Sequence, residues 1–196
     1  LVCNAGPALR ITEDFVDRYE NVAIAGLAYS MFCMPSSFSS SVPPFYLNAH
    51  VYSCTLVLNN IPNRWRSFYN DDTDMCLQVL SDGWCTVLMN AFMVDKTWTM
   101  QVKGGNTPVY QGDGRLEMAR SLERLWPHVV TTRRRFQRPQ HIVRNRWRKF
   151  DTKLKRRAGV DFSKLPAVDE QGLKMTQVEA EIKSDTLREA VAGELA

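Results

Sequence analysis

The sequence lacks a long uncharged apolar run and any paired-cysteine motif. A membrane-spanning helix needs about 18 or more consecutive apolar residues, but the longest uncharged stretch, residues 21–63, is interrupted by prolines, serines and a histidine. The five cysteines include no Cys-x-x-Cys pair, which argues against a disulfide framework or a structural zinc site. We therefore expect a cytoplasmic protein without a transmembrane segment, in which the cysteines stay reduced and act as small hydrophobic residues.

The first residues also lack a methionine and a secretory signal, so we expect this sequence to be a fragment of a longer protein or a processed product. Its hydrophobic fraction of 44% and its five tryptophans are typical of a folded domain rather than a disordered chain. A length of 196 residues is enough for one sizeable core and a small appendage.

Positive charge is concentrated in one segment, residues 133–157. It contains twelve Lys and Arg residues and only one acidic residue, Asp151, so its local charge is +11 and the rest of the chain carries −7. Such a segment neutralises phosphates, and interleaved aromatic residues can stack on exposed bases. The pattern favours nucleic-acid binding, and attachment to anionic lipid or to an acidic partner is the alternative.

The residues of this basic segment that we expect to contact nucleic acid are its first eight cations. They are Arg133, Arg134, Arg135, Arg138, Arg144, Arg146, Arg148 and Lys149. The aromatic residues interleaved with them are Phe136, Trp147 and Phe150.

An acidic cluster opens the most informative part of the chain, residues 69–92. Asn70 or Asp71 is expected to cap a helix that buries Leu77 and Leu80 and ends at Gly83. Met75 and Val79 are expected near the edges of the buried stripe, and residues 84–92 are predicted to form a strand. Three carboxylates in the first turn, which the helix dipole keeps ionised, can act as a general base or face a metal. Simple helix capping is the alternative.

The remaining pattern alternates helices and strands. It predicts helices over residues 12–20 and 115–126, strands over residues 22–29 and 50–58, and a loop over residues 35–44 of the kind that covers a site. In the second helix, Leu116, Ala119, Leu122 and Leu125 are expected to face inward. We therefore predict an α/β fold, a mixed and mostly parallel sheet flanked by helices, with a basic C-terminal extension.

Several short motifs together resemble one family of proteins. They are Arg64-Trp65-Arg66, Tyr69-Asn70-Asp71-Asp72-Thr73-Asp74, Gly83-Trp84-Cys85-Thr86, Lys96, Thr99-Met100 and Lys103-Gly104-Gly105-Asn106-Thr107. The string is similar to glycosyltransferases of GT-A type found in phage genomes near TET/JBP-like base oxidases, and the resemblance runs from about Tyr19 to Asp151. The chain departs at Asp71, where the family prefers Glu, and at Met75, where it prefers Leu.

This resemblance implies a GT-A-like (Rossmann-like) fold and an enzyme that moves a sugar from a nucleotide-sugar donor, such as a UDP-sugar, to hydroxymethylated pyrimidines in phage DNA. Asp72 matches the position of the inverting base, which removes a proton from the acceptor hydroxyl. Asp71 would be a second carboxylate that reads the acceptor or the sugar. Asp74 is the alternative base, or a residue that only interacts with the helix dipole.

The resemblance also implies a divalent metal, Mn or Mg, that neutralises the departing diphosphate. His141 is the residue we expect to bind it, although Gln140 stands where the family has the first histidine of an Arg-x-His-His pattern. A surface or phosphate contact is the alternative for His141. His50 is expected to pack or hydrogen-bond near the serine-rich loop.

Two further motifs are candidates for binding the donor or the acceptor. Lys103, Gly104, Gly105 and Asn106 supply backbone N–H groups and a cation suited to phosphate or sugar hydroxyls, although most Gly-Gly pairs are simply turns. Trp65, with Arg66 beside it, is expected either to stack on a ring of the substrate or to anchor a loop.

We divide the chain accordingly. Residues 1–130 form the acceptor-side part of a GT-A-like domain whose N-terminal nucleotide-binding half is missing, because no Asp-x-Asp precedes Asp72. Residues 131–160 form the nucleic-acid-contacting segment, and residues 161–196 form a charged helical or disordered tail. The alternatives are a non-catalytic nucleic-acid-binding structural protein and a glycosyltransferase with a non-DNA acceptor.

Overall fold

The computed structural model describes residues 4–32, 43–52, 54–96, 107–147 and 149–164. Within these ranges the helices are α1 (Ala5–Val16), α2 (Asp71–Ser81) and α3 (Gly114–Leu125). The strands are β1 (Val22–Tyr29), β2 (Phe45–Leu47), β3 (Thr55–Val57), β4 (Cys85–Val94), β5 (Val130–Arg135) and β6 (Arg138–Val143). None of the helices in the described ranges is long and apolar enough to cross a membrane.

The four-stranded sheet has the order β2-β4-β1-β3. β1 runs parallel to β4, whereas β3 and β2 pair with them in antiparallel fashion at the two edges. The predicted mixed sheet flanked by helices is therefore confirmed, and the architecture is consistent with a Rossmann-like fold. The prediction that the sheet is mostly parallel is wrong, because both edge strands run antiparallel to their neighbours, β3 to β1 and β2 to β4.

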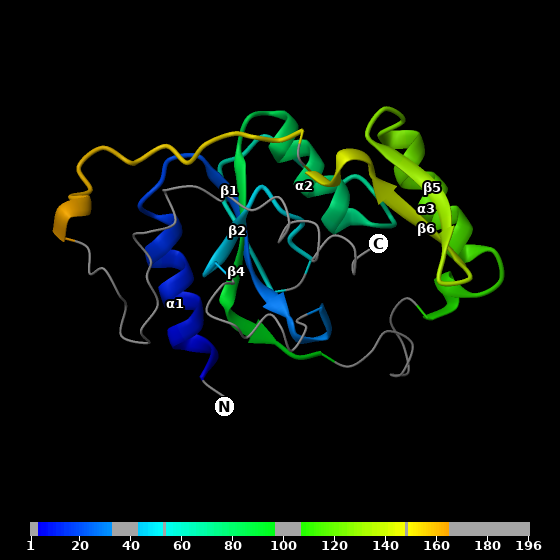
Figure 1. Cartoon of the computed structure of the whole chain (residues 1–196), viewed down its shortest axis with the longest axis horizontal. Coiled ribbons are helices and arrows are strands. Elements are labelled where there is room, and N and C mark those ends of the chain that lie inside the picture. The colour runs from blue at the N-terminus through cyan, green and yellow to red at the C-terminus, as the bar shows by residue number, and fades with distance from the viewer. Residues whose placement is uncertain (1–3, 33–42, 53, 97–106, 148, 165–196) are drawn as a thin grey trace.

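Helices cover both faces of this sheet (Figure 1). α1 packs on one face, where its Phe15 ring lies 4.7 Å from the ring of Phe45. α2 packs on the other face through Leu77 and Val79, which are both fully buried. All eight residues of β1 are buried, as expected of a central strand covered on both sides.

The sequence pattern predicted the positions of β1 and α2 correctly. β1 coincides with the predicted strand, and α2 begins at Asp71 and is followed by Gly83, whose φ of +83° suits glycine. The predicted cap is only partly right. Asn70 occupies the N-cap position but makes no side-chain capping hydrogen bond, because its Nδ2 donates to the Met118 carbonyl in α3 at 2.8 Å.

Other boundaries differ from the prediction. The first helix is α1, and Thr12 lies inside it with its hydroxyl donating to the Ala8 carbonyl at 2.9 Å instead of capping its start. The strand expected over residues 50–58 is reduced to β3 because Cys54 has a positive φ of 48°, which interrupts extended backbone. In α3, Leu125 is 40% exposed rather than inward, because the chain turns at Trp126 and places that indole against α2.

β5 and β6 form a two-stranded hairpin that packs on α3, at the end of the molecule opposite α1 (Figure 1). The hairpin turn is Phe136-Gln137, and both residues have positive φ, 47° and 61°. The predicted domain boundary between residues 130 and 131 falls inside β5, which begins at Val130.

After the hairpin the chain returns to the sheet. Phe150 is buried in the core beside α2, and Asn48 Nδ2 donates to the carbonyls of Phe150 and Thr152. Asn21 likewise bonds the Lys153 carbonyl and the Lys155 N–H. We call residues 150–157 the return segment. The predicted loop over residues 35–44 and the tail after residue 164 lie largely or wholly outside the described residues.

Candidate active site

The first turn of α2 carries three carboxylates in three different environments. Asp71 is exposed to solvent, Asp72 is 35% exposed, and Asp74 is fully buried. Successive helical positions turn by about 100°, so Asp72 faces a different direction from Asp71 and Asp74. Asp71 and Asp74 are three residues apart and share one side of the helix, so their different burial comes from what packs against each of them. The three side chains therefore have separate roles.

Asp74 is committed to structural contacts. Arg66 donates to both of its oxygens, Nε to Oδ2 at 3.0 Å and Nη2 to Oδ1 at 2.9 Å. Gln78 Nε2 donates to Oδ2 at 2.9 Å, and Trp126 Nε1 donates to Oδ1 at 2.7 Å. A buried carboxylate with this set of donors has no route to a substrate proton, so the suggestion that Asp74 is a base, or only a dipole partner, does not fit its contacts.

Arg66 contacts Trp126 as well as Asp74. Its guanidinium lies over the Trp126 ring at 5.4 Å, and the hydrogen bond to Asp74 raises the pKa of Arg66 despite some desolvation. The predicted substrate-binding role of Arg66 therefore competes with a structural one. The neighbouring Trp65 is 53% exposed, which leaves its ring accessible.

Asp72 faces His50. Asp72 Oδ1 accepts a hydrogen bond from the Thr73 N–H at 2.7 Å, and Oδ2 lies 3.4 Å from His50 Nε2. Burial by itself would raise the pKa of the Asp72 carboxyl, but His50, the Thr73 N–H and the more distant His141 outweigh burial, so that pKa lies below its usual value. Asp72 is accordingly ionised at neutral pH.

The His50 ring is fixed by aromatic neighbours. Trp147 stacks on it with ring centroids 5.6 Å apart and planes inclined by 13°, and Tyr52 lies against it at 5.2 Å. The Thr73 hydroxyl lies 3.2 Å from Nε2. Trp147 has a positive φ of 67°, an uncommon conformation for a bulky residue. No local pattern indicates this His50–Trp147 contact, because the two residues are almost a hundred positions apart.

His141 lies in β6, opposite Thr132. Burial and, to a smaller extent, the nearby His50 lower the pKa of His141 to about 4, and Asp72 opposes this shift. His141 is therefore neutral at pH 7, which is the form that ligates metals. Within the described part of the chain, however, no group of three or more His, Cys, Asp or Glu residues is arranged to hold a metal ion.

The remaining predicted residues are dispersed. Lys103, Gly104, Gly105, Asn106 and Arg148 lie outside the described residues. Arg133, Arg134, Arg138, Arg144 and Lys149 are exposed, and Arg135 is half-buried. The three aromatic residues of the basic segment differ: Phe150 is in the core, Trp147 stacks on His50, and Phe136 is 67% exposed.

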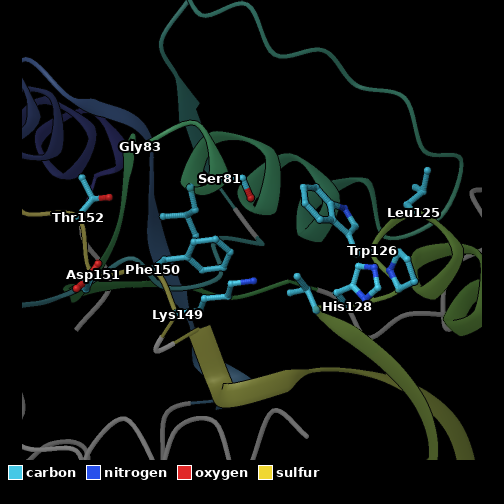
Figure 2. A pocket seen from close by; sticks show the side chains of 12 residues that line it. Ser81, Gly83, Leu125, Trp126, His128, Lys149, Phe150, Asp151 and Thr152 are labelled. Atoms are coloured by element: carbon cyan, nitrogen blue, oxygen red, sulfur yellow. The ribbon is translucent and has the colours of Figure 1, made fainter.

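A cavity of about 610 Å³ opens at the C-terminal end of α2. Trp126 and His128 lie to one side of it, and Phe150, Asp151 and Thr152 lie to the other (Figure 2). Its α2 residues, Leu80 and Ser81, are at the opposite end of the helix from Asp72. Because an 11-residue helix is about 16 Å long, this cavity is separate from the Asp72 site.

Comparison with known proteins identifies the family. Residues 2–105, more than half of the chain, match the family described as TET-Associated Glycosyltransferase. No curated protein and no solved structure matches the chain. The matched range contains His50, Asp72 and Asp74 and ends before the β5–β6 hairpin. With its α/β fold and an ionised carboxylate at the start of α2, this chain belongs to the TET-associated glycosyltransferase family.

Proposed function

We propose that the protein transfers a sugar from a UDP-sugar to the hydroxyl of a hydroxymethylated pyrimidine in DNA, with Asp72 as the general base. One observation carries this proposal. Of the three carboxylates on the first turn of α2, only Asp72 is at once partly exposed and held by a histidine, with a pKa below its usual value. Such a group is ionised at neutral pH, so it can take up the proton of a bound hydroxyl while the hydroxyl oxygen attacks, although the lowered pKa makes it a weaker base.

In the proposed step, one Asp72 oxygen removes the proton of the acceptor hydroxyl. The acceptor oxygen forms a bond to the anomeric carbon, while the bond from that carbon to the diphosphate oxygen breaks and its electron pair leaves with the diphosphate. The Thr73 N–H holds Oδ1 and His50 lies beside Oδ2, so the carboxylate is oriented before the substrate arrives.

DNA as the acceptor is supported by charge. The hairpin that carries His141 also carries the exposed Arg133 and Arg134, and cations of this kind bind phosphates without regard to sequence. A protein that only binds DNA has no use for an ionised carboxylate close to a polyanion. The Asp72 site therefore favours an enzyme over the alternative of a binding protein.

The divalent metal expected of a GT-A-like enzyme remains a prediction. A neutral His141 fits the chemistry of a ligand, but the described residues do not bring together a set of three ligands around it. When bound, such a metal would neutralise charge on the departing diphosphate.

The test is sugar transfer to hydroxymethylcytosine-containing duplex DNA from a panel of UDP-sugars. Asp72→Asn is expected to lower turnover by about 100-fold or more, because a general base contributes on this scale, while the fold and DNA binding are retained. Asp14→Asn, which removes an exposed carboxylate from α1, serves as the control with normal turnover. Asp74→Asn should instead lower the unfolding temperature, because it removes the charge that Arg66 binds. Normal transfer by Asp72→Asn would refute the assignment of the base.

A further inference from the structure

The tip of the β5–β6 hairpin combines an exposed aromatic ring with an unfavourable backbone. Phe136 and Gln137 form a two-residue turn in which both residues have positive φ. Asn-Gly is the sequence that such turns prefer, and a bulky residue there is an outlier. Phe136 is also 67% exposed, so burial in this chain does not account for the ring at this position.

Positive charge surrounds this ring. Arg135 and Arg138 lie directly opposite each other at the end of the hairpin, so two cations flank the turn. Arg133 and Arg134, which are exposed, form no ion pair with the described residues. A partner with regularly spaced phosphates would neutralise these exposed charges.

Phe136 also differs from the other aromatic residues of the basic segment. Phe150 is buried in the core and Trp147 stacks on His50, so neither ring is available to an external base. Of these three aromatic residues, Phe136 has the exposed ring and can contact a partner.

The hairpin connects this tip to the candidate site. His141 pairs with Thr132, and Arg134 with Pro139 two residues nearer the tip, so these two pairs share one face of the hairpin. Asp72 and His141 each influence the pKa of the other, so the hairpin borders the surroundings of Asp72. Phe136 follows Thr132 by four positions, which is ~13 Å along an extended strand.

We propose that Phe136 is a wedge that enters the base stack of duplex DNA and helps turn the acceptor base out toward Asp72. This inference rests on the proposed function, because DNA is its partner. Apolar side chains inserted between base steps unstack and kink a duplex, and enzymes that modify a base commonly take it out of the stack. The flanking arginines hold the two phosphate backbones while the ring enters.

The test uses the full chain and a duplex with 2-aminopurine beside the hydroxymethylcytosine, because 2-aminopurine becomes brighter when it is unstacked. The wild-type protein is expected to raise this fluorescence several-fold. Phe136→Ala should remove the rise and weaken duplex binding by about 5- to 150-fold, the range for losing one aromatic–base stack. Phe136→Trp should restore the rise. Phe68→Ala, which removes a ring that is 75% exposed elsewhere, is the matched control and should leave the fluorescence unchanged.

A second variant separates the wedge from folding of the hairpin. The double change Phe136→Asn and Gln137→Gly installs the preferred turn, so the hairpin should be at least as stable by thermal unfolding while the fluorescence rise is lost. Retention of the rise in this variant, or in Phe136→Ala, would overturn the wedge.

The remaining outcomes distinguish the wedge from its alternatives. A Phe136-dependent rise without sugar transfer would support the wedge and count against the proposed function. Sugar transfer by Phe136→Ala to duplex and single-stranded DNA at equal rates would overturn the wedge and leave the proposed function standing. Phe136-dependent binding to phosphatidylserine vesicles, with no change in 2-aminopurine fluorescence, would also overturn the wedge and would indicate a membrane surface instead.

Discussion

At the residue scale, Asp71, Asp72 and Asp74 share one helical turn and differ in what surrounds them. Asp74 is buried under Arg66 and Trp126, and such a pair is costly to break because the charge left behind is buried. Asp72 keeps a partly exposed carboxylate next to His50. Burial and partners, more than residue type, therefore distinguish the three carboxylates, and they are the reason that we propose Asp72 as the base.

His141 makes a pH dependence of stability testable. Its pKa is about 4 in the folded protein and about 6.5 when unfolded. Between these values the unfolded chain binds more protons than the folded one, so the free energy of unfolding falls as the pH falls, by at most about 1.4 kcal/mol per pH unit from this group. We expect His141→Gln to flatten the change in denaturation midpoint between pH 7 and pH 5.

The matched control is His128→Gln, because His128 is exposed and its removal should leave that pH dependence as in the wild type. An unchanged pH dependence in His141→Gln would contradict the assignment of a neutral imidazole in β6.

At the element scale, the return segment joins the hairpin to the sheet. The side chains of Asn21 and Asn48 satisfy four of its backbone groups, so side-chain hydrogen bonds hold a stretch that has no regular secondary structure. The segment also sets the position of Trp147 just before it, and through Trp147 that of the His50 ring.

We expect Asn48→Ala to destabilise the fold by about 1–3 kcal/mol, because the carbonyls of Phe150 and Thr152 lose their buried donor. Thermal unfolding measures the loss, and hydrogen exchange in residues 150–155 should increase. Asn59→Ala, at an exposed position, should do neither. Equal stability of the two variants would show that the return segment is held by other contacts.

At the scale of the whole molecule, the basic segment spans both ends. The segment 133–157 carries +11 and the rest of the chain −7. Its first four arginines are on the hairpin, at the end of the molecule opposite α1 (Figure 1), whereas Arg156 and Arg157 lie beside Tyr19 and Asp17. The hairpin arginines would attract a polyanion to that end of the molecule.

The salt dependence of DNA binding tests this attraction. Replacing Arg133, Arg134 and Arg135 with Gln is expected to reduce the slope of log affinity against log salt by up to about 2.7, or about 0.9 for each phosphate that the protein no longer neutralises. Arg10→Gln, an exposed position on α1, should leave the slope unchanged. A triple variant with the wild-type slope would place the DNA-binding surface elsewhere on the protein.

The features that depend on local spacing were predictable from the sequence alone. Gly83 ends α2 because its backbone conformation favours glycine, and β1 is an uninterrupted apolar run that had to be covered on both faces. The cluster of carboxylates at a helix start was visible for the same reason, since the helical period and the capping residues lie within one turn of each other.

Tertiary structure decided which of those residues can do chemistry. Asp74 meets the Trp126 indole across 52 positions of sequence, and His50 meets Trp147 across nearly twice as many, so no local pattern could show that Asp74 is occupied or that His50 orients Asp72. The turn at Phe136 was equally hidden. The charged run around this residue does not predict a hairpin turn in which two residues have positive φ angles. Contacts between distant segments form only when the whole core is assembled, and they set the burial and the electrostatic surroundings on which the role of each carboxylate and ring depends.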